Sequence, residues 1–86
     1  MQPRIGKDID KKQLGRELKD LIFAKGYTSI YDFHKKSAQD LISYTTLKQT
    51  ISGRAGISLA NLLNIAEALD MKPLEFFAAF SFKRIG

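Results

Sequence analysis

The stretch ISYTTLKQTISGRAGIS, spanning Ile42–Ser58, is unusual in a small chain whose other segments are typical of helices. It is crowded with Thr, Ser and Tyr, and it carries the polar side chains of Lys48, Gln49 and Arg54. No Asp or Glu occurs anywhere in residues 41–66. A partner that repels carboxylates would account for this composition.

Ser43 is a good N-cap, so the stretch predicts a short helix over about residues 43–52. Only Leu47, together with Thr50 or Ile51, is apolar or compact enough to face a core. The β-branched residues lower the helix propensity, so neighbouring elements must hold this helix in place. Most of its surface is therefore expected to stay exposed.

A first helix is predicted over residues 11–25. Asp10 and Gln13 have the spacing of a capping box, and Gly26 can adopt the left-handed backbone conformation that ends a helix. Its apolar face is formed by Leu14, Leu18, Leu21 and Ile22. A second helix begins at Ser29, with Asp32 three residues later, and its end is not marked. Its inward face is expected to comprise Ile30, Phe33, Ser37 or Ala38, and Leu41.

After the break SGRAG, Ser58 starts a strongly apolar fourth helix that is expected to form the centre of the core. Its apolar residues are Leu59, Leu62, Leu63, Ile65, Ala66 and Leu69. Pro73 suits the first position of a short fifth helix, which continues through Leu74, Phe77 and Phe80. The fold class is therefore a compact five-helix all-α domain over residues 1–86, with a basic arm (1–9) and a tail (81–86).

Composition limits the functions that this chain can have. A chain of 86 residues buries only about 60% of its unfolded surface, which favours binding over elaborate chemistry. A net charge of +5 favours a polyanion, either nucleic acid or an anionic membrane surface. The absence of Cys excludes disulfides and thiolate sites and suits the cytoplasm, and no apolar run approaches the roughly 18 residues of a membrane span.

No pattern of residues points to catalysis. The acidic residues are scattered, and no glycine-rich phosphate loop precedes a helix. His34 is the sole histidine, so a structural role is expected for it and no metal site or cofactor is expected. The sequence therefore predicts a protein that is not an enzyme.

The segments ISYTTLKQTISG and ISLANLLNIAEALDMKPLEFF resemble the Cro and phage-repressor class of helix-turn-helix regulators, which has the lambda-repressor-like fold. The matching positions are Ile42, Ser43, Leu47, Gly53, Ser58, Leu62, Ile65, Ala66, Ala68 and Leu69. The resemblance covers roughly residues 10–77. It implies a sequence-specific regulator that binds double-stranded DNA as a homodimer, in the cytoplasm of a prokaryote or encoded by a phage or plasmid.

The resemblance also implies which side chains contact DNA. The third helix would enter the major groove, with base edges contacted by Tyr44, Thr45, Lys48 and Gln49. A glutamine can pair with adenine through two hydrogen bonds, a lysine can reach guanine acceptors, and a ring or methyl group can pack on a thymine methyl. Phosphate contacts would come from Ser29, Ser43, Thr46 and Arg54.

The sequence departs from the family between Gly26 and Ile42, where it has about three residues more than the family pattern. We therefore expect helix two or the turn after it to be longer. The basic residues of the N-terminal segment offer two alternatives, contact with DNA or a solubilising end. These residues are Arg4, Lys7, Lys11 and Lys12.

The C-terminal end is rich in apolar residues, which suggests a dimer surface formed by Phe76, Phe80, Phe82 and Ile85. The alternative is that these side chains cover the open end of the chain's own core. Two other functions also remain open. One is the DNA-binding antitoxin of a toxin–antitoxin pair, which a neighbouring short toxin gene would indicate. The other is a protein-interaction adaptor that keeps the fold without binding DNA.

Overall fold

The computed structural model describes residues 10–54 and 58–81, and all regular structure within these ranges is helical. The elements are α2 (Lys11–Ala24), α3 (Ile30–Phe33), η1 (His34–Ala38), α4 (Tyr44–Ser52), α5 (Leu59–Ala68) and α6 (Pro73–Ala78). The expected all-α architecture with five α-helices is thus confirmed for the described part of the chain. The arm (1–9), Phe82 and Ile85 lie outside the described residues.

Four of the α-helices begin at the side chains predicted to cap them. Each cap oxygen accepts a hydrogen bond from the backbone N–H three residues later, at 2.9–3.1 Å. The caps are Asp10, Ser29, Ser43 and Ser58. A cap of this kind contributes about 1 kcal/mol. Pro73 starts α6 at its first position, also as predicted.

The predicted capping box at α2 is only half correct. Asp10 accepts from the Gln13 N–H, but the Gln13 side chain turns the other way. Its Nε2 donates to Glu17 at 3.2 Å, and its Oε1 accepts from Arg16 at 2.6 Å. Neighbours three and four residues along the exposed helix face therefore compete successfully for the amide.

The core is formed by every helix of the described part. Phe33, Leu47 and Phe76 are wholly buried, and Leu18, Ile22 and Ile65 join them. The prediction that two leucines lie in the core is wrong, because Leu59 is 64% exposed and Leu74 is 87% exposed. Both lie in the first turn of their helix, before the first buried residue of α5 or α6.

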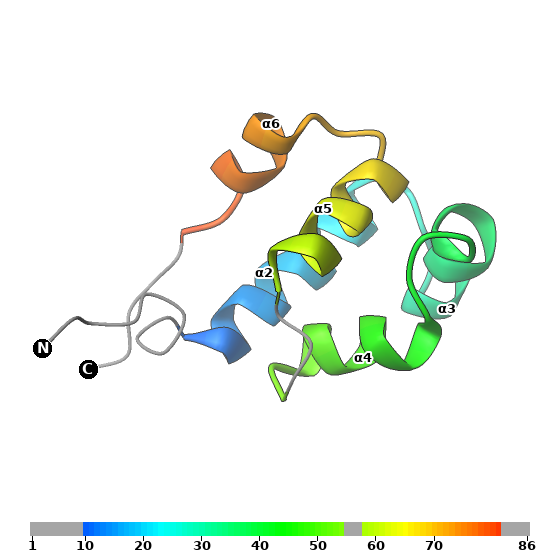
Figure 1. Cartoon of the computed structure of the whole chain (residues 1–86), viewed down its shortest axis with the longest axis horizontal. Helices are drawn as coiled ribbons and strands as arrows, with labels where there is room; N and C mark the ends of the chain where they lie inside the picture. Colours follow the sequence, from blue (N-terminus) through cyan, green and yellow to red (C-terminus); the bar gives the residue numbers. More distant parts are fainter. Residues whose placement is uncertain (1–9, 55–57, 82–86) are drawn as a thin grey trace, which may run out of the picture.

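Figure 1 shows α4 and α6 at opposite edges of the molecule, with α2 and α5 between them and α3 at one end. Packing joins α4 to α2, and α5 to both η1 and α6. None of the helices in the two described ranges is long and apolar enough to span a bilayer.

The second helix continues from α3 into η1, whose five residues are π-helical. A π-helical turn takes more residues than an α-helical one. Phe33 and Ala38 are the buried side chains of the pair, in agreement with the expected face. His34 Nε2 lies 2.7 Å from the Ile42 carbonyl oxygen, which ties the helix to the turn before α4.

Candidate functional site

The helix α4 is attached to the core by few side chains. Leu47 is wholly buried, Thr50 is 1% exposed, and Ile51 packs partly against the same cluster. The hydroxyl group of Thr50 has a hydrogen-bond partner although it is buried, because its Oγ1 donates to the Thr46 carbonyl oxygen at 2.9 Å. The expected inward face is therefore confirmed, and the rest of the helix surface points outward.

Two glycines allow α4 to approach α2 unusually closely. A Cβ placed on Gly15 would lie 1.9 Å from the Ile51 carbonyl oxygen. At the end of α4, Gly53 has a φ of +77°, and a Cβ there would lie 3.0 Å from the Lys12 Cα. Gly53 ends the helix as predicted, whereas the requirement at Gly15 was not anticipated because it depends on a helix far along the chain.

The four side chains expected to contact bases gather around one hollow of about 370 Å³ on the outer face of α4. The hollow is lined by Tyr44, Thr45, Lys48, Gln49, Ser52 and Arg54. Arg54 reaches this group because its backbone N–H donates to the Gln49 carbonyl oxygen at 3.2 Å, beyond the left-handed Gly53. Among the described residues no carboxylate lines the hollow, and the charged groups in its lining are the cations of Lys48 and Arg54.

An aromatic cluster surrounds Tyr44 at the start of α4. The Tyr31 ring meets it edge to face with the centroids 5.6 Å apart, and the His34 ring lies 5.4 Å away. The Lys48 amine lies 5.2 Å from the centre of the Tyr44 ring, within range of a cation–π interaction. Residues of α3, η1 and α4 itself therefore contact the Tyr44 ring.

The expected phosphate-contacting residues do not form one group. Ser43 and Thr46 are joined to each other at the start of α4, with the Ser43 hydroxyl donating to Thr46 Oγ1 at 2.8 Å. Arg54 is part of the hollow at the other end of the helix. Ser29 is on the separate α3 terminus, where its Oγ accepts the Asp32 N–H.

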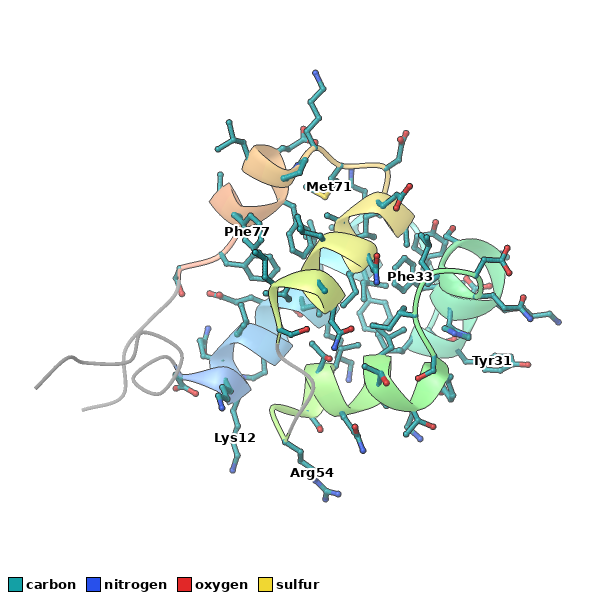
Figure 2. The ribbon with its side chains drawn as sticks, viewed as in Figure 1. Lys12, Tyr31, Phe33, Arg54, Met71 and Phe77 are labelled. Carbon is teal, nitrogen blue, oxygen red and sulfur yellow. The ribbon has the colours of Figure 1, made fainter. Side chains whose placement is uncertain are left out.

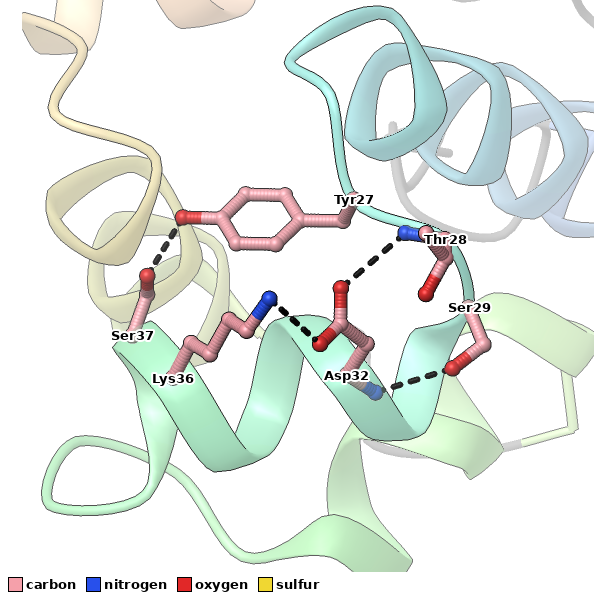
Figure 3. Close-up of polar contacts among 6 residues, drawn as sticks. All are labelled: Tyr27, Thr28, Ser29, Asp32, Lys36 and Ser37. Carbon is pink, nitrogen blue, oxygen red and sulfur yellow. Dashed lines mark hydrogen bonds and ion pairs between the residues drawn. The ribbon is translucent and has the colours of Figure 1, made fainter.

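The start of α3 is held by a polar network around Asp32 (Figure 3). The Asp32 carboxylate accepts the Thr28 N–H at 3.0 Å and pairs with the Lys36 amine at 3.0 Å. The hydrogen bond from Thr28, followed by the contact with Lys36, lowers the pKa of Asp32. Tyr27 adds a hydrogen bond to Ser37, which links the preceding loop to η1. At this terminus the Asp32 carboxylate occupies the Thr28 N–H and is paired with the Lys36 cation.

Lys12 was expected in a basic N-terminal segment, and the structure places it next to the α4 terminus. Its backbone lies against Gly53, the residue before Arg54. Figure 2 shows the side chains of Lys12 and Arg54 projecting from the same side of the molecule. The cationic surface therefore extends from α4 to the first turn of α2.

The expected dimer surface is wrong for two of its residues. Phe76 is wholly buried and Phe80 is 8% exposed, and their rings pack on each other at 4.9 Å. The alternative interpretation is confirmed for both, since they cover the end of the chain's own core. The backbone after them is tied down as well, because Ser81 donates to Glu17 through its N–H and its hydroxyl.

Comparison of the chain with protein-family models, with curated proteins and with solved structures finds no match.

Proposed function

We propose that this chain is a sequence-specific DNA-binding regulator of the helix-turn-helix type, in which α4 enters the major groove. The proposal includes the lambda-repressor-like arrangement, with α3 and η1 as the helix before the turn. It places the protein in the cytoplasm of a prokaryote, encoded by the cell, a phage or a plasmid.

The observation that carries the proposal is the hollow on the outer face of α4. It brings two hydrogen-bonding side chains, Lys48 and Gln49, beside the methyl group of Thr45 and the ring of Tyr44. Base edges in the major groove present donors, acceptors and a methyl group, which these side chains match. The cationic and neutral lining also suits the phosphates on both sides of that groove.

Packing supports the same assignment. A helix that enters a groove must be held rigidly while most of its own surface is free, and α4 meets both conditions through Leu47, Thr50 and the close contact at Gly15. The major groove is about 12 Å wide, which admits one α-helix. Arg54 and Lys12 are then the residues we assign to the phosphate backbone.

We assign no phosphate contact to Ser29. The Asp32 carboxylate is bonded to the adjacent Thr28 N–H, so this helix terminus already holds an anion. The Thr28 N–H is therefore not available to a phosphate, in contrast to the start of α4, whose first turn has no acidic residue. The hydroxyl groups of Ser43 and Thr46 are better placed to contact the phosphate backbone of DNA than the hydroxyl group of Ser29.

A homodimer remains part of the proposal because regulators of this type bind paired half-sites about 34 Å apart. With Phe76 and Phe80 inside the core, Leu74 is the large apolar side chain of α6 that is exposed among the described residues. Sedimentation at high concentration, with and without DNA, measures the oligomeric state. A monomer under both conditions would remove the dimer from the proposal.

DNA binding itself is tested by titrating a mixed-sequence duplex at several salt concentrations. We expect binding at low salt, with log affinity falling by about 0.9 per phosphate contacted for each unit of log salt. No binding even at low salt would contradict the proposal and favour an adaptor that interacts with other proteins.

A further inference from the structure

A second hollow, of about 280 Å³, adjoins the first one. Its lining consists of Ile30, Tyr44, Lys48, Ile51 and Ser52. Tyr44, Lys48 and Ser52 line both hollows, so the two are neighbours on one surface. The first hollow is lined by residues whose side chains mostly carry polar groups, and the exposed lining of the second is mainly apolar, so they are called the polar hollow and the apolar hollow.

The apolar character of the second hollow comes from two helices. Ile30 is contributed by the first position of α3, and Ile51 and Tyr44 by α4. Both isoleucines are only partly buried, so the core does not use all of their surface. Lys48 lines the hollow, and the part of the chain that the structure describes places no carboxylate there. An apolar recess of this kind inside a cationic surface is suited to an apolar group that is attached to a polyanion.

DNA has one such group in the major groove, the methyl on C5 of thymine. A cytosine methylated at C5 carries the same group in the same place. We propose that the hollow of Ile30, Tyr44 and Ile51 binds a pyrimidine 5-methyl group, so that this protein distinguishes methylated from unmethylated pyrimidines at one position of its site. The proposal rests on the proposed function, because it requires α4 to lie in the major groove.

Tyr31 has a positioning role in this arrangement. Its ring is 57% exposed and adds little to the core, yet it holds the Tyr44 ring edge to face at 5.6 Å. His34 supports the same ring from η1. The wall of the hollow formed by Tyr44 is thereby fixed before DNA binds, which keeps the recess open for a methyl group.

The test uses duplexes that carry the site selected from random sequences. Each thymine in turn is replaced by uracil, which removes the methyl group and keeps every hydrogen-bonding group. The methyl ratio is the affinity for the thymine duplex divided by that for the uracil duplex. Burial of one methyl group predicts a ratio of about four at one position of the half-site. Two further duplexes carry 5-methylcytosine or cytosine at that position. The affinity for the first divided by that for the second should give a similar ratio, which tests 5-methylcytosine as the other source of the methyl group.

Variants then locate the methyl group on the protein. Ile30→Ala alters a residue that lines only the apolar hollow, and Thr45→Ser removes a methyl group that lines only the polar one. At the position where the wild-type protein shows the methyl ratio of about four, we expect the first variant to bring this ratio close to one and the second to leave it unchanged. Both duplexes are compared on the same protein, so a loss of stability does not change this ratio.

A second pair of variants tests the positioning role of Tyr31. Tyr31→Ala should lower the methyl ratio, and Tyr31→Phe should restore it because the ring edge is retained. Phe23→Ala is the matched control, since Phe23 is also a partly exposed ring but lies near the end of α2. This control should leave the ratio at the wild-type value.

The outcomes separate the two proposals. A protein that binds no duplex contradicts the proposed function itself. A protein that selects a site but shows a methyl ratio of one at every position overturns the methyl proposal alone. A ratio that survives Ile30→Ala and disappears in Thr45→Ser would also overturn it, because the methyl group would then be bound in the polar hollow.

Discussion

The Cα of Gly15 faces the carbonyl oxygen of Ile51 so closely that a Cβ there would lie 1.9 Å from that oxygen. Separations below 3.0 Å are essentially never seen for real Cβ atoms, and the atom opposite belongs to the backbone. The helix proposed to enter DNA is therefore placed against α2 by the absence of a single side chain. Alanine at this position must push α4 outward.

We predict that Gly15→Ala lowers the free energy of unfolding by about 1–3 kcal/mol, although alanine has the higher helix propensity. Displacing α4 should also weaken DNA binding by the folded protein. Urea unfolding and duplex titration measure the two effects. Gly26→Ala is the control: its φ of +100° makes it costly, but no atom lies within 4 Å of the added Cβ, so DNA affinity should not change. A Gly15→Ala variant as stable as the wild type would contradict the close packing.

The carboxylate of Asp32 should make stability depend on acid pH. Its pKa is lowered in the folded state, so its contribution is complete above the ordinary value of 3.8 and is lost as the pH falls through the lowered value. Asp32→Asn keeps an oxygen that can accept from Thr28 and removes the charge. The difference in unfolding free energy between the two proteins should be constant near neutral pH and should shrink below about pH 4. A difference independent of pH would show that the charge contributes nothing.

Because Phe76 is buried in the core, its replacement should destabilise the folded protein and should not act on association between chains. Phe76→Ala should lower the free energy of unfolding by about 3–5 kcal/mol, a large part of the stability of so small a domain. Leu74→Ala, two residues earlier and 87% exposed, should change it by less than about 0.5 kcal/mol. Thermal unfolding of the two variants makes the comparison. Equal effects would mean that Phe76 is not a core residue.

The sequence was sufficient to predict features that depend on near neighbours. The caps at Asp10, Ser29, Ser43 and Ser58 each bond to the residue three positions later, so the signal and the contact lie in one turn. The lining of the polar hollow is similar, because positions 44, 45, 48 and 49 share one helix face by periodicity alone.

Other features depend on which helices meet, and these were missed. Nothing near Gly15 in the sequence shows that α4 will pass against it, and nothing near Phe76 distinguishes a core ring from a surface ring. The apolar hollow joins Ile30 to Ile51 across two helices, and the cationic surface joins Lys12 to Arg54. The exposure of Leu59 has the same origin, because a helix face is buried only where another element covers it.

Gln49 is the residue from which we expect the clearest effect on sequence preference. Gln49→Ala should reduce discrimination by about 1–3 kcal/mol at one or two base pairs and leave the other positions unchanged. Competition between single-base variants of the selected site measures this. Gln39→Ala removes a similar exposed amide from the turn after η1 and should have no effect. An unchanged preferred site and affinity in Gln49→Ala would mean that the base-contacting face is assigned incorrectly.

Arg54 should behave differently, because we assign it to the phosphate backbone. Arg54→Ala is expected to weaken binding to all duplexes alike and to reduce the steepness of the salt dependence by about one unit. Titrations over a range of salt concentrations provide the slope. Lys72→Ala, just before α6 and so at the opposite edge from α4 (Figure 1), should leave the slope unchanged. A change in base preference without a change in slope would place Arg54 at a base edge.

Selection of binding sites from random duplexes tests the central claim most directly, because it measures binding, sequence preference and half-site spacing in one experiment. We predict an enriched site with two related halves about 10 base pairs apart, bound through α4. Repeating the selection with Gln49→Ala should relax one or two positions in each half. Recovery of no enriched sequence would contradict the claim that this chain recognises DNA through α4.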